Sequence, residues 1–224
     1  MSSVATGWDL VAQNTKKQGM LVVLSGPSGA GKDTVIKILR SRHAKLHYTV
    51  TTTTRPPREG EVDWENYHFV TRDAFEDMKK GNEFLEWVEY NGNYYGTPRE
   101  QIRKALGEGK VVILKIEVRG AIAVKKLVPD ALFIFITTPN QDELIERLKG
   151  RETDLQHDQK ERLAIANEEV KEITNYDFLI INHNDQALAC AEKVWAIIVA
   201  ESCRVGRQDI AKFIDEKLDN NILK

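Results

Sequence analysis

A glycine-rich segment between a predicted strand and a predicted helix constrains the fold more than any other feature of the chain. Residues 20–24 read Met-Leu-Val-Val-Leu and predict a buried strand, and residues 26–32 then match the pattern G-x-x-x-x-G-K. Such a loop directs backbone N–H groups and the positive end of the next helix at a phosphate, while Lys32 reaches the outer phosphates. We therefore expect nucleotide binding by the loop residues Gly26, Pro27, Ser28, Gly29, Ala30, Gly31, Lys32, Asp33 and Thr34.

The residue after Lys32 departs from the usual form of this loop. A serine or threonine normally stands there and its hydroxyl helps to hold Mg²⁺, but this chain has Asp33. A carboxylate oxygen is a good ligand for Mg²⁺, yet it brings negative charge toward a triphosphate. Asp33 is therefore the candidate metal ligand, and Thr34 would supply a hydroxyl only if the helix start were shifted.

The rest of the chain alternates short apolar runs with segments of helical periodicity, which predicts strand–helix–strand units and a parallel sheet. Further strands are expected at residues 111–116, 131–136 and 178–181, and helices at residues 143–148 and 187–200. We assign residues 19–50 and 98–204 to a doubly wound α/β core. Residues 51–97, rich in threonine and aromatic residues, interrupt this core and predict a small mixed α/β insertion.

Composition excludes several classes of function. The 224 residues carry 32 Lys+Arg and 34 Asp+Glu, so the net charge of −2 gives no general attraction to nucleic acid or to an anionic membrane. No apolar run approaches the roughly 20 residues that span a bilayer. Residues 1–18 read as a polar tail without a signal-peptide core, which predicts a cytoplasmic protein, and residues 205–224 read as a C-terminal tail. Cys190 and Cys203 fall in a late helix and at its exit, a pattern typical of neither a disulfide framework nor a zinc site.

The insertion carries side chains that suit a phosphate and a purine base. Arg55 and Arg58 flank two prolines on a stiffened turn and can grip one phosphate, and the hydroxyls of Tyr67 and Tyr95 can donate to the same oxygens. Glu86 is an acceptor when ionised, so its two oxygens suit the N1–H and N2–H₂ donors of guanine. Adenine presents an acceptor at N1 and would leave the carboxylate unpaired.

Together with the glycine-rich loop, residues 51–61, 67–70, 83–87 and 93–97 resemble the guanylate kinase family, in the same order and with similar spacings from about residue 20 to about residue 200. The resemblance implies a P-loop nucleoside monophosphate kinase that transfers the γ-phosphoryl group of ATP to GMP, and also to dGMP, with Mg²⁺. It implies the GMP-binding residues Thr51, Arg55, Arg58, Tyr67, Glu86, Tyr95, Thr97 and Glu117. The oligomeric state stays open.

Two positions of the predicted strand 111–117 bear on this resemblance. Lys115 and Glu117 share one face near its carboxyl end, where ligands bind in open parallel sheets. The family commonly has two acidic residues here. This chain has an acidic residue at one position, Glu117, and a basic residue at the other, Lys115. We expect Lys115 and Asp33 to compensate each other's charge.

A polar, charged stretch at residues 149–160 predicts a mobile loop between two helices, and we place a lid at about residues 147–162. Arg147, Arg151 and Arg162 match the arginines that the family brings onto the phosphates. Charge on a moving phosphoryl group is spread over its oxygens, so positioned cations are the main catalytic device. The candidate catalytic residues are thus Lys32 and these three arginines.

Two other readings remain. A ribose bisphosphate phosphokinase has a similar Gly-Lys-Asp loop, but a sugar phosphate does not require Arg58, Glu61, Tyr67 or the Glu86–Trp87 pair. A non-catalytic, peptide-binding domain of the guanylate-kinase-like kind usually has an eroded loop, whereas Lys32 and its glycines are intact here.

Overall fold

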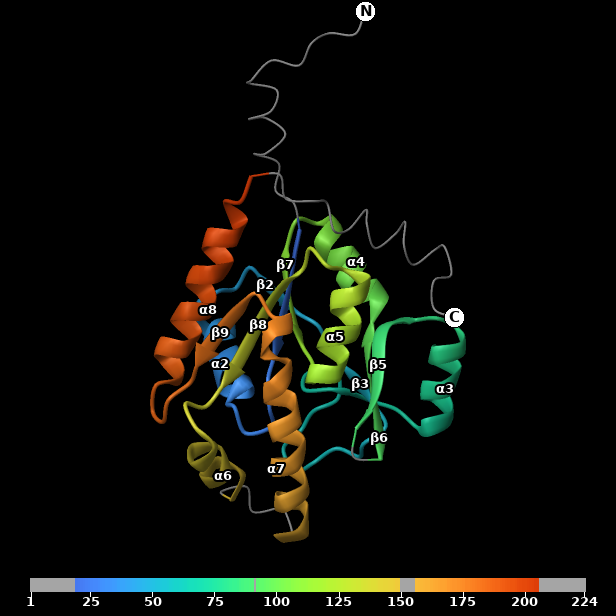
Figure 1. Ribbon diagram of the computed structural model, residues 1–224. Coiled ribbons are helices and arrows are strands. Elements are labelled where there is room, and N and C mark those ends of the chain that lie inside the picture. The colour runs from blue at the N-terminus through green and yellow to red at the C-terminus, as the bar shows by residue number, and fades with distance from the viewer. Residues whose placement is uncertain (1–18, 91, 150–155, 206–224) are drawn as a thin grey trace, which may run out of the picture.

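A five-stranded parallel sheet lies at the centre of the computed structural model, which describes residues 19–90, 92–149 and 156–205 (Figure 1). The strand order is β2-β7-β1-β8-β9, and every neighbouring pair is parallel. The strands are β1 (Met20–Ser25), β2 (Leu46–Tyr48), β7 (Val111–Lys115), β8 (Leu132–Thr137) and β9 (Phe178–Ile181). The predicted doubly wound α/β core is confirmed.

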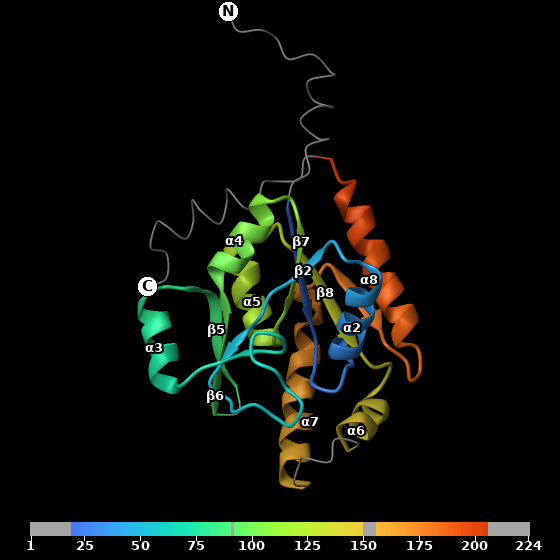
Figure 2. The same ribbon diagram turned by 180° about the vertical axis from the view of Figure 1, so that it is seen from behind.

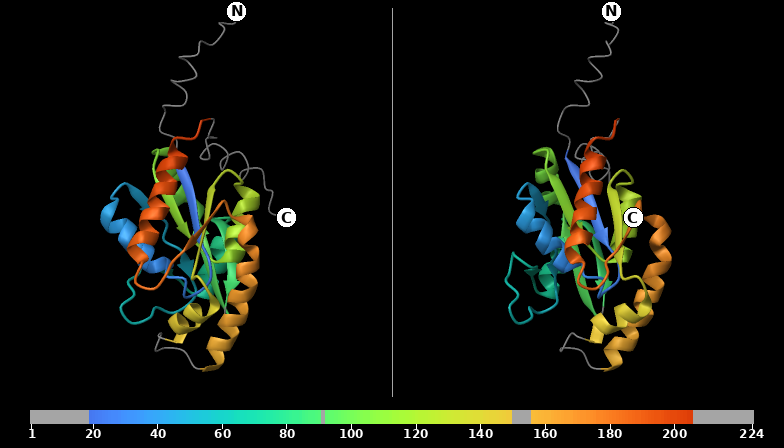
Figure 3. Two further views of the ribbon diagram at one scale, coloured as in Figure 1. Left: turned by 60° about the vertical axis from the view of Figure 1, so that its left-hand side comes forward. Right: turned by 90° about the vertical axis from the view of Figure 1, so that its left-hand side faces the viewer.

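Helices cover both faces of this sheet because β1 is apolar on both faces. Met20, Val22 and Leu24 pack in one buried cluster, while Leu21 and Val23, which point the other way, pack in a second. The first cluster includes side chains of α2 (Lys32–Arg42) and α8 (Ala187–Ser202), and the second those of α4 (Arg99–Gly107) and α5 (Val118–Leu127). Figure 3 shows blue α2 and red α8 on one side of the sheet and orange α7 (Gln156–Lys171) on the other.

The insertion forms a second, four-stranded sheet with the order β4-β3-β6-β5 and one helix, α3, on its outer side (Figure 2). Its elements are β3 (Thr52–Thr53), β4 (His68–Phe69), α3 (Arg72–Lys80), β5 (Phe84–Tyr90) and β6 (Asn93–Pro98). A small aromatic core of Phe75, Phe84 and Tyr94 holds α3 on the sheet. Leu85 of β5 instead joins the core cluster beneath α5, which ties the insertion to the main body.

The structure also departs from several predicted boundaries. Helix α6 (Gln141–Lys149) runs up to residue 149 and α7 already begins at residue 156, so residues 156–160 of the predicted loop are helical. Gln156, Gln159 and Lys160 are good helix formers, so the polarity of this stretch was a poor indicator of a loop. Strand β7 ends at Lys115, and Glu117 is the N-cap residue of α5 rather than a strand residue.

Other expectations concern the chain ends and the cysteines. Residues 1–18 and 206–224, which make up nearly all of the two predicted tails, lie outside the described residues, as do residues 150–155. Cys190 is buried in α8 and Cys203 caps that helix, and both are free, as expected. Within the described ranges, every helix is too short or too polar to cross a lipid bilayer.

The tight packing of β6 on α3 gives a stability prediction. A Cβ added at Gly96 would lie 2.8 Å from Phe84 Cδ1 and 2.9 Å from Phe75 Cζ. Because both rings are buried, Gly96→Ala should lower the free energy of unfolding by about 1–3 kcal/mol, measured by urea denaturation. Gly107→Ala, at the end of α4 with nothing within 4 Å of its Cβ, is the matched control and should be neutral or slightly stabilising. Equal stability of the two variants would contradict this account of the insertion.

Candidate active site

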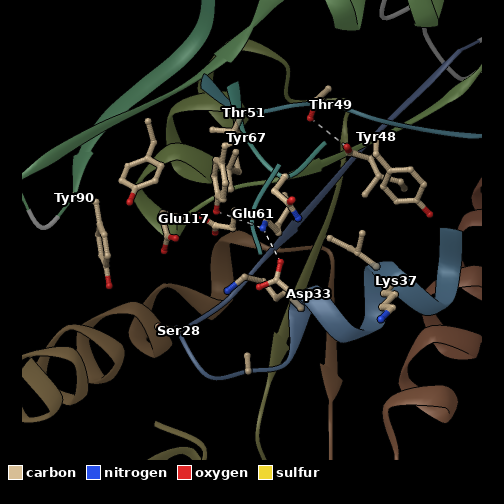
Figure 4. A pocket seen from close by; sticks show the side chains of 18 of the residues that line it. Ser28, Asp33, Lys37, Tyr48, Thr49, Thr51, Glu61, Tyr67, Tyr90 and Glu117 are labelled. Carbon is tan, nitrogen blue, oxygen red and sulfur yellow. Dashed lines mark hydrogen bonds and ion pairs between the residues drawn. The ribbon is translucent and has the colours of Figure 1, made fainter. Parts of the chain in front are cut away.

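One cavity of about 470 Å³ lies between the carboxyl ends of the core strands and the inner face of the insertion sheet. Its lining joins the glycine-rich loop, residues 28–33, to side chains of the insertion. Figure 4 shows Asp33 from the loop side and Tyr67, Glu61 and Glu117 around the same space. The two groups of residues that the sequence predicted separately therefore share one cleft.

The glycine-rich loop needs glycine at two close approaches. Gly26 has φ of 136°, and a Cβ there would lie 2.0 Å from the carbonyl oxygen of Ile136 in β8. Gly31 has φ of 86°, and a Cβ there would lie 2.4 Å from Asn182 Nδ2. The loop therefore packs directly on β8 and on the residue that follows β9. Helix α2 begins immediately after the loop at Lys32. This is the strand–loop–helix arrangement that binds phosphate.

Lys32 folds back over this loop. Its Nζ donates to the carbonyl oxygens of Gly26 and Pro27, the latter at 3.0 Å. Burial lowers the pKa of Lys32, while the carboxylates of Glu117, Glu169 and Asp33 oppose that shift. An ammonium in this position has donors to offer to a phosphate that enters the cleft.

The nine predicted loop residues fall into three groups. Ser28, Gly29, Ala30, Gly31, Lys32 and Asp33 line the cavity. Gly26 and Pro27 instead shape the loop and accept hydrogen bonds from Lys32. Thr34 is exposed in the first turn of α2 and does not line the cavity, so the helix start is not shifted in the way that a role for its hydroxyl would need.

Asp33 and Lys115 form an ion pair across the cleft. Lys115 Nζ lies 2.6 Å from Asp33 Oδ1, and 3.5 Å from the hydroxyl oxygen of Tyr67. The pairing of these two charges, expected from the sequence, is confirmed. It connects the start of α2, the end of β7 and the insertion at one point.

Arg55 and Arg58 both line the cavity, next to Glu61, which the sequence singled out without assigning it a binding role. The carboxylate of Glu61 accepts from Arg55 Nη2 at 2.8 and 2.9 Å, and from the backbone N–H of Arg58 at 2.8 Å. Glu61 thus fixes the turn that presents both arginines. Its signal in the sequence was an acidic residue six positions after Arg55 on a proline-stiffened turn.

Tyr67 and Tyr95 close this end of the cleft with Thr51. The Arg55 guanidinium lies 5.3 Å from the centroid of the Tyr67 ring, and the Tyr67 and Tyr95 rings meet edge to face at 6.2 Å. Burial raises the pKa of Tyr95, so its hydroxyl keeps its proton and can donate. Thr51 is buried and also contributes to the lining.

Glu86 is a buried carboxylate with one oxygen paired. Its Oε1 accepts from Thr97 Oγ1 at 2.6 Å, and the two residues lie opposite each other on β5 and β6. Its Oε2 has no hydrogen-bond partner in the described part of the chain, and it lies against Gly120, where a Cβ would be 2.7 Å away. Burial, with a contribution from Glu117, raises the pKa of Glu86 to about 7, although Thr97 opposes the shift.

Glu117 lines the cavity from the N-cap of α5. Its Oε2 is buried and finds no hydrogen-bond partner among residues 19–90, 92–149 and 156–205. Two carboxylates, Glu86 and Glu117, thus lie in one part of the cleft with acceptor oxygens to spare. Such a pair suits a ligand that carries several N–H donors.

Of the three predicted catalytic arginines, only Arg147 has a side chain that the structure describes. Arg147 of α6 donates to Asn182 O at 2.7 Å and to Asn184 Oδ1 at 3.0 Å, and its Nη1 lies 3.5 Å from Ala30 O. It thus lies beside the glycine-rich loop but outside the cavity lining. Arg151 lies outside the described residues, and Arg162 falls in α7 at a position whose side chain is not described.

Two residues near the loop were missed. Asn182 follows β9, donates to Ala30 O at 2.8 Å and fills the space beside Gly31, and its position after a parallel strand was a usable signal. Glu169 of α7 is 7% exposed, and burial together with Glu117 raises its pKa to about 7 against the opposing effect of Lys32. A glutamate in a charged helix usually faces solvent, so nothing in the sequence marked it.

The chain is similar to guanylate kinases in sequence and in structure. Residues 18–200 match the family model described as Guanylate kinase. A guanylate kinase of Bacillus anthracis is 46% identical over 201 residues, covering 89% of this chain and 96% of that protein. A guanylate kinase of Lactococcus lactis is 47% identical over 193 residues, covering 86% and 93% respectively.

A solved structure agrees with these sequence matches. The crystal structure of guanylate kinase from Anaplasma phagocytophilum superposes with a TM-score of 0.70 at 26% identity, covering 91% of this chain and 97% of that one. The glycine-rich loop and the insertion that faces it both fall inside the matched segment. The chain therefore belongs to the guanylate kinase family.

Proposed function

We propose that this chain is a guanylate kinase, which transfers the γ-phosphoryl group of ATP to GMP or dGMP and gives ADP and GDP or dGDP. The observation that carries the proposal is the single cleft lined by the glycine-rich loop on one side and by Arg55, Arg58 and Glu86 on the other. Membership of the guanylate kinase family supports the same activity. Both nucleotides would place their phosphates between the glycine-rich loop and the arginines of the insertion.

The donor nucleotide would bind at the glycine-rich loop. Residues 28–33 line the cleft, and backbone N–H groups of this loop would receive the phosphates of ATP. Lys32 would exchange its contacts with the loop carbonyls for the outer phosphates. Because the ammonium is desolvated there, its charge acts on a phosphate more strongly than it would in water.

The acceptor nucleotide would bind at the insertion. Arg55 and Arg58 would hold its phosphate, with the hydroxyls of Tyr67 and Tyr95 as further donors. The Oε2 of Glu86, which has no hydrogen-bond partner among the described residues, would accept from the guanine N1–H and N2–H₂ groups, and Glu117 would help to hold the base. Thr97 fixes the orientation of Glu86, and Thr51 lies close to the same space.

Transfer needs alignment and positive charge rather than a proton acceptor. The acceptor phosphate oxygen is already ionised, so no general base has to remove a proton before attack. Lys32, Arg147, Arg151 and Arg162 are the cations we assign to the transferred group. The position of Arg147 beside Ala30 O supports its share in this role. A closing lid that carries arginines would exclude water, which would otherwise compete with GMP as acceptor.

Mg²⁺ is proposed to enter with ATP. Among the described residues no group of three or more His, Cys, Asp or Glu side chains is placed to hold a metal ion. Asp33 is the candidate ligand, and its Oδ1 already accepts from Lys115. The ion would therefore be held chiefly by the nucleotide phosphates, which is the usual way that Mg²⁺ binds in kinases. Its role there is to neutralise phosphate charge.

The proposal is tested by phosphoryl transfer from ATP to a panel of GMP, dGMP, AMP, UMP and ribose bisphosphate. We expect GMP and dGMP to be the preferred acceptors, because Glu86 meets an acceptor atom at N1 of adenine and the uracil ring is too small to reach it. A preference for ribose bisphosphate would favour the sugar phosphokinase reading. A failure to turn over any acceptor would favour a binding domain. A cytoplasmic location is part of the proposal, since nucleotide pools are intracellular.

Substitutions at the two ends of the cleft should separate base recognition from phosphate binding. Glu86→Gln should weaken GMP binding by about 10- to 150-fold, because it replaces a charged hydrogen-bond acceptor, and should leave ATP binding nearly unchanged. Lys32→Ala should lower kcat by on the order of 100-fold with little effect on guanine selectivity. Both are measured by steady-state kinetics and calorimetry. Glu89→Gln, on the same strand but exposed, is the control. Equal losses toward both substrates in each variant would contradict these roles.

The affinity for GMP should depend on pH through Glu86. Guanine donors bind the ionised carboxylate, so binding lowers a pKa that stands at about 7 in the free protein and releases a proton. The affinity should therefore fall by up to about tenfold per pH unit below 7 and level off above it. Calorimetric titrations from pH 6 to 8.5 measure this, with Glu86→Gln as reference because the GMP phosphate titrates equally in both proteins. Parallel profiles for the two proteins would disprove the link.

A further inference from the structure

Lys115 lies between the two anion-binding groups of the cleft. It is the last residue of β7 and pairs in register with Leu24 of β1, one residue before the strand turns toward the glycine-rich loop. Its Nζ is 2.6 Å from Asp33 Oδ1 on the loop side. On the insertion side it is 3.5 Å from the hydroxyl oxygen of Tyr67, whose ring contacts Arg55. The ammonium therefore stands where a phosphoryl group would pass from one substrate to the other.

The solvent exposures of Asp33 and Lys115 indicate which side chain is held in position by the ion pair. The Asp33 side chain is 72% exposed, whereas that of Lys115 is 27% exposed. A carboxylate so open to water needs no partner to offset desolvation, and an exposed ion pair contributes little to stability. The half-buried ammonium is the group whose position the pair determines. Burial alone would lower the pKa of Lys115, but Tyr67 and Asp33 raise it, so the side chain stays charged.

The ammonium also has donor capacity for a ligand. It carries three N–H donors, of which one is directed at Asp33 and another faces Tyr67 at the long end of hydrogen-bond range. Like the glycine-rich loop, Lys115 borders the cavity itself. A phosphate oxygen in the cleft can therefore be reached without breaking the pair with Asp33.

We propose that Lys115 is a catalytic residue that contacts the phosphoryl group during transfer, and that Asp33 is a positioning residue that holds its ammonium in place. This inference rests on the proposed kinase function and adds a residue to that site. It also gives Asp33 a role toward Lys115 in place of one as a metal ligand. Charge that develops on the transferred oxygens would be stabilised by an ammonium already oriented toward them.

A double-mutant cycle tests this assignment, using Lys115→Met, Asp33→Asn and the combined variant of the full chain. Lys115→Met should lower kcat by about 100-fold, while calorimetric dissociation constants for GMP and for ATP change by less than about threefold. Asp33→Asn should lower kcat by about tenfold when Lys115 is present and have no further effect once Lys115 is replaced. Lys115→Arg should restore part of the lost rate. Lys104→Met, which removes an exposed lysine of α4, is the control.

Each other result contradicts the inference in its own way. Recovery of wild-type kcat in the combined variant would mean that Lys115 only neutralises Asp33. Losses that multiply would mean that Asp33 acts independently, for example on Mg²⁺. Unchanged kcat in Lys115→Met, or a loss confined to binding, would remove Lys115 from the transfer step. If the wild-type protein prefers another phosphate acceptor, the proposed function fails, and the same cycle run with that acceptor still decides the role of Lys115.

Discussion

The turn from β1 into α2 is the constraint on which the site depends. Gly26 packs so closely on the carbonyl oxygen of Ile136 in β8 that no side chain fits, and Asn182, after β9, occupies the space beside Gly31. The loop is therefore shaped by the strands behind it as well as by its own glycines. Once this turn is fixed, the direction of α2 and the positions of Lys32 and Asp33 follow from it. The cleft is built on that fixed edge of the sheet.

The cleft contains buried carboxylates that the described part of the protein does not fully satisfy with hydrogen bonds. Glu86 and Glu117 each keep a buried oxygen without a hydrogen bond in the described structure, and the pKa of Glu86 is raised to about 7 by burial. Burying such groups costs free energy, which the fold tolerates at functional sites. A base with several N–H donors would relieve that cost, whereas one with an acceptor would increase it. Selectivity can thus come from the cost of leaving Glu86 unpaired.

The sequence predicted the features that depend on local patterns. The loop at residues 26–32, the parallel core and the mixed insertion were all recognisable from motif spacing and periodicity, and the Asp33–Lys115 pair was expected from two departures in charge. The loop predicted at residues 149–160 was too long. Helix α7 already begins at residue 156, where several residues are good helix formers. Glu169 was missed because only tertiary packing reveals that a glutamate of a charged helix is buried beside the loop. Arg147, which the family resemblance assigned to the phosphates, lies beside the loop, but its hydrogen bonds to Asn182 and Asn184 were not indicated by the sequence.

The proposed function requires one cleft to bind both nucleotides at once with their phosphates facing each other. The most direct measurement is a calorimetric titration with a bisubstrate compound in which adenosine and guanosine are joined through five phosphates. We expect one molecule to bind per chain, more tightly than ATP or GMP alone, and either nucleotide to displace the compound. Binding no tighter than that of ATP, with displacement by ATP but not by GMP, would contradict it.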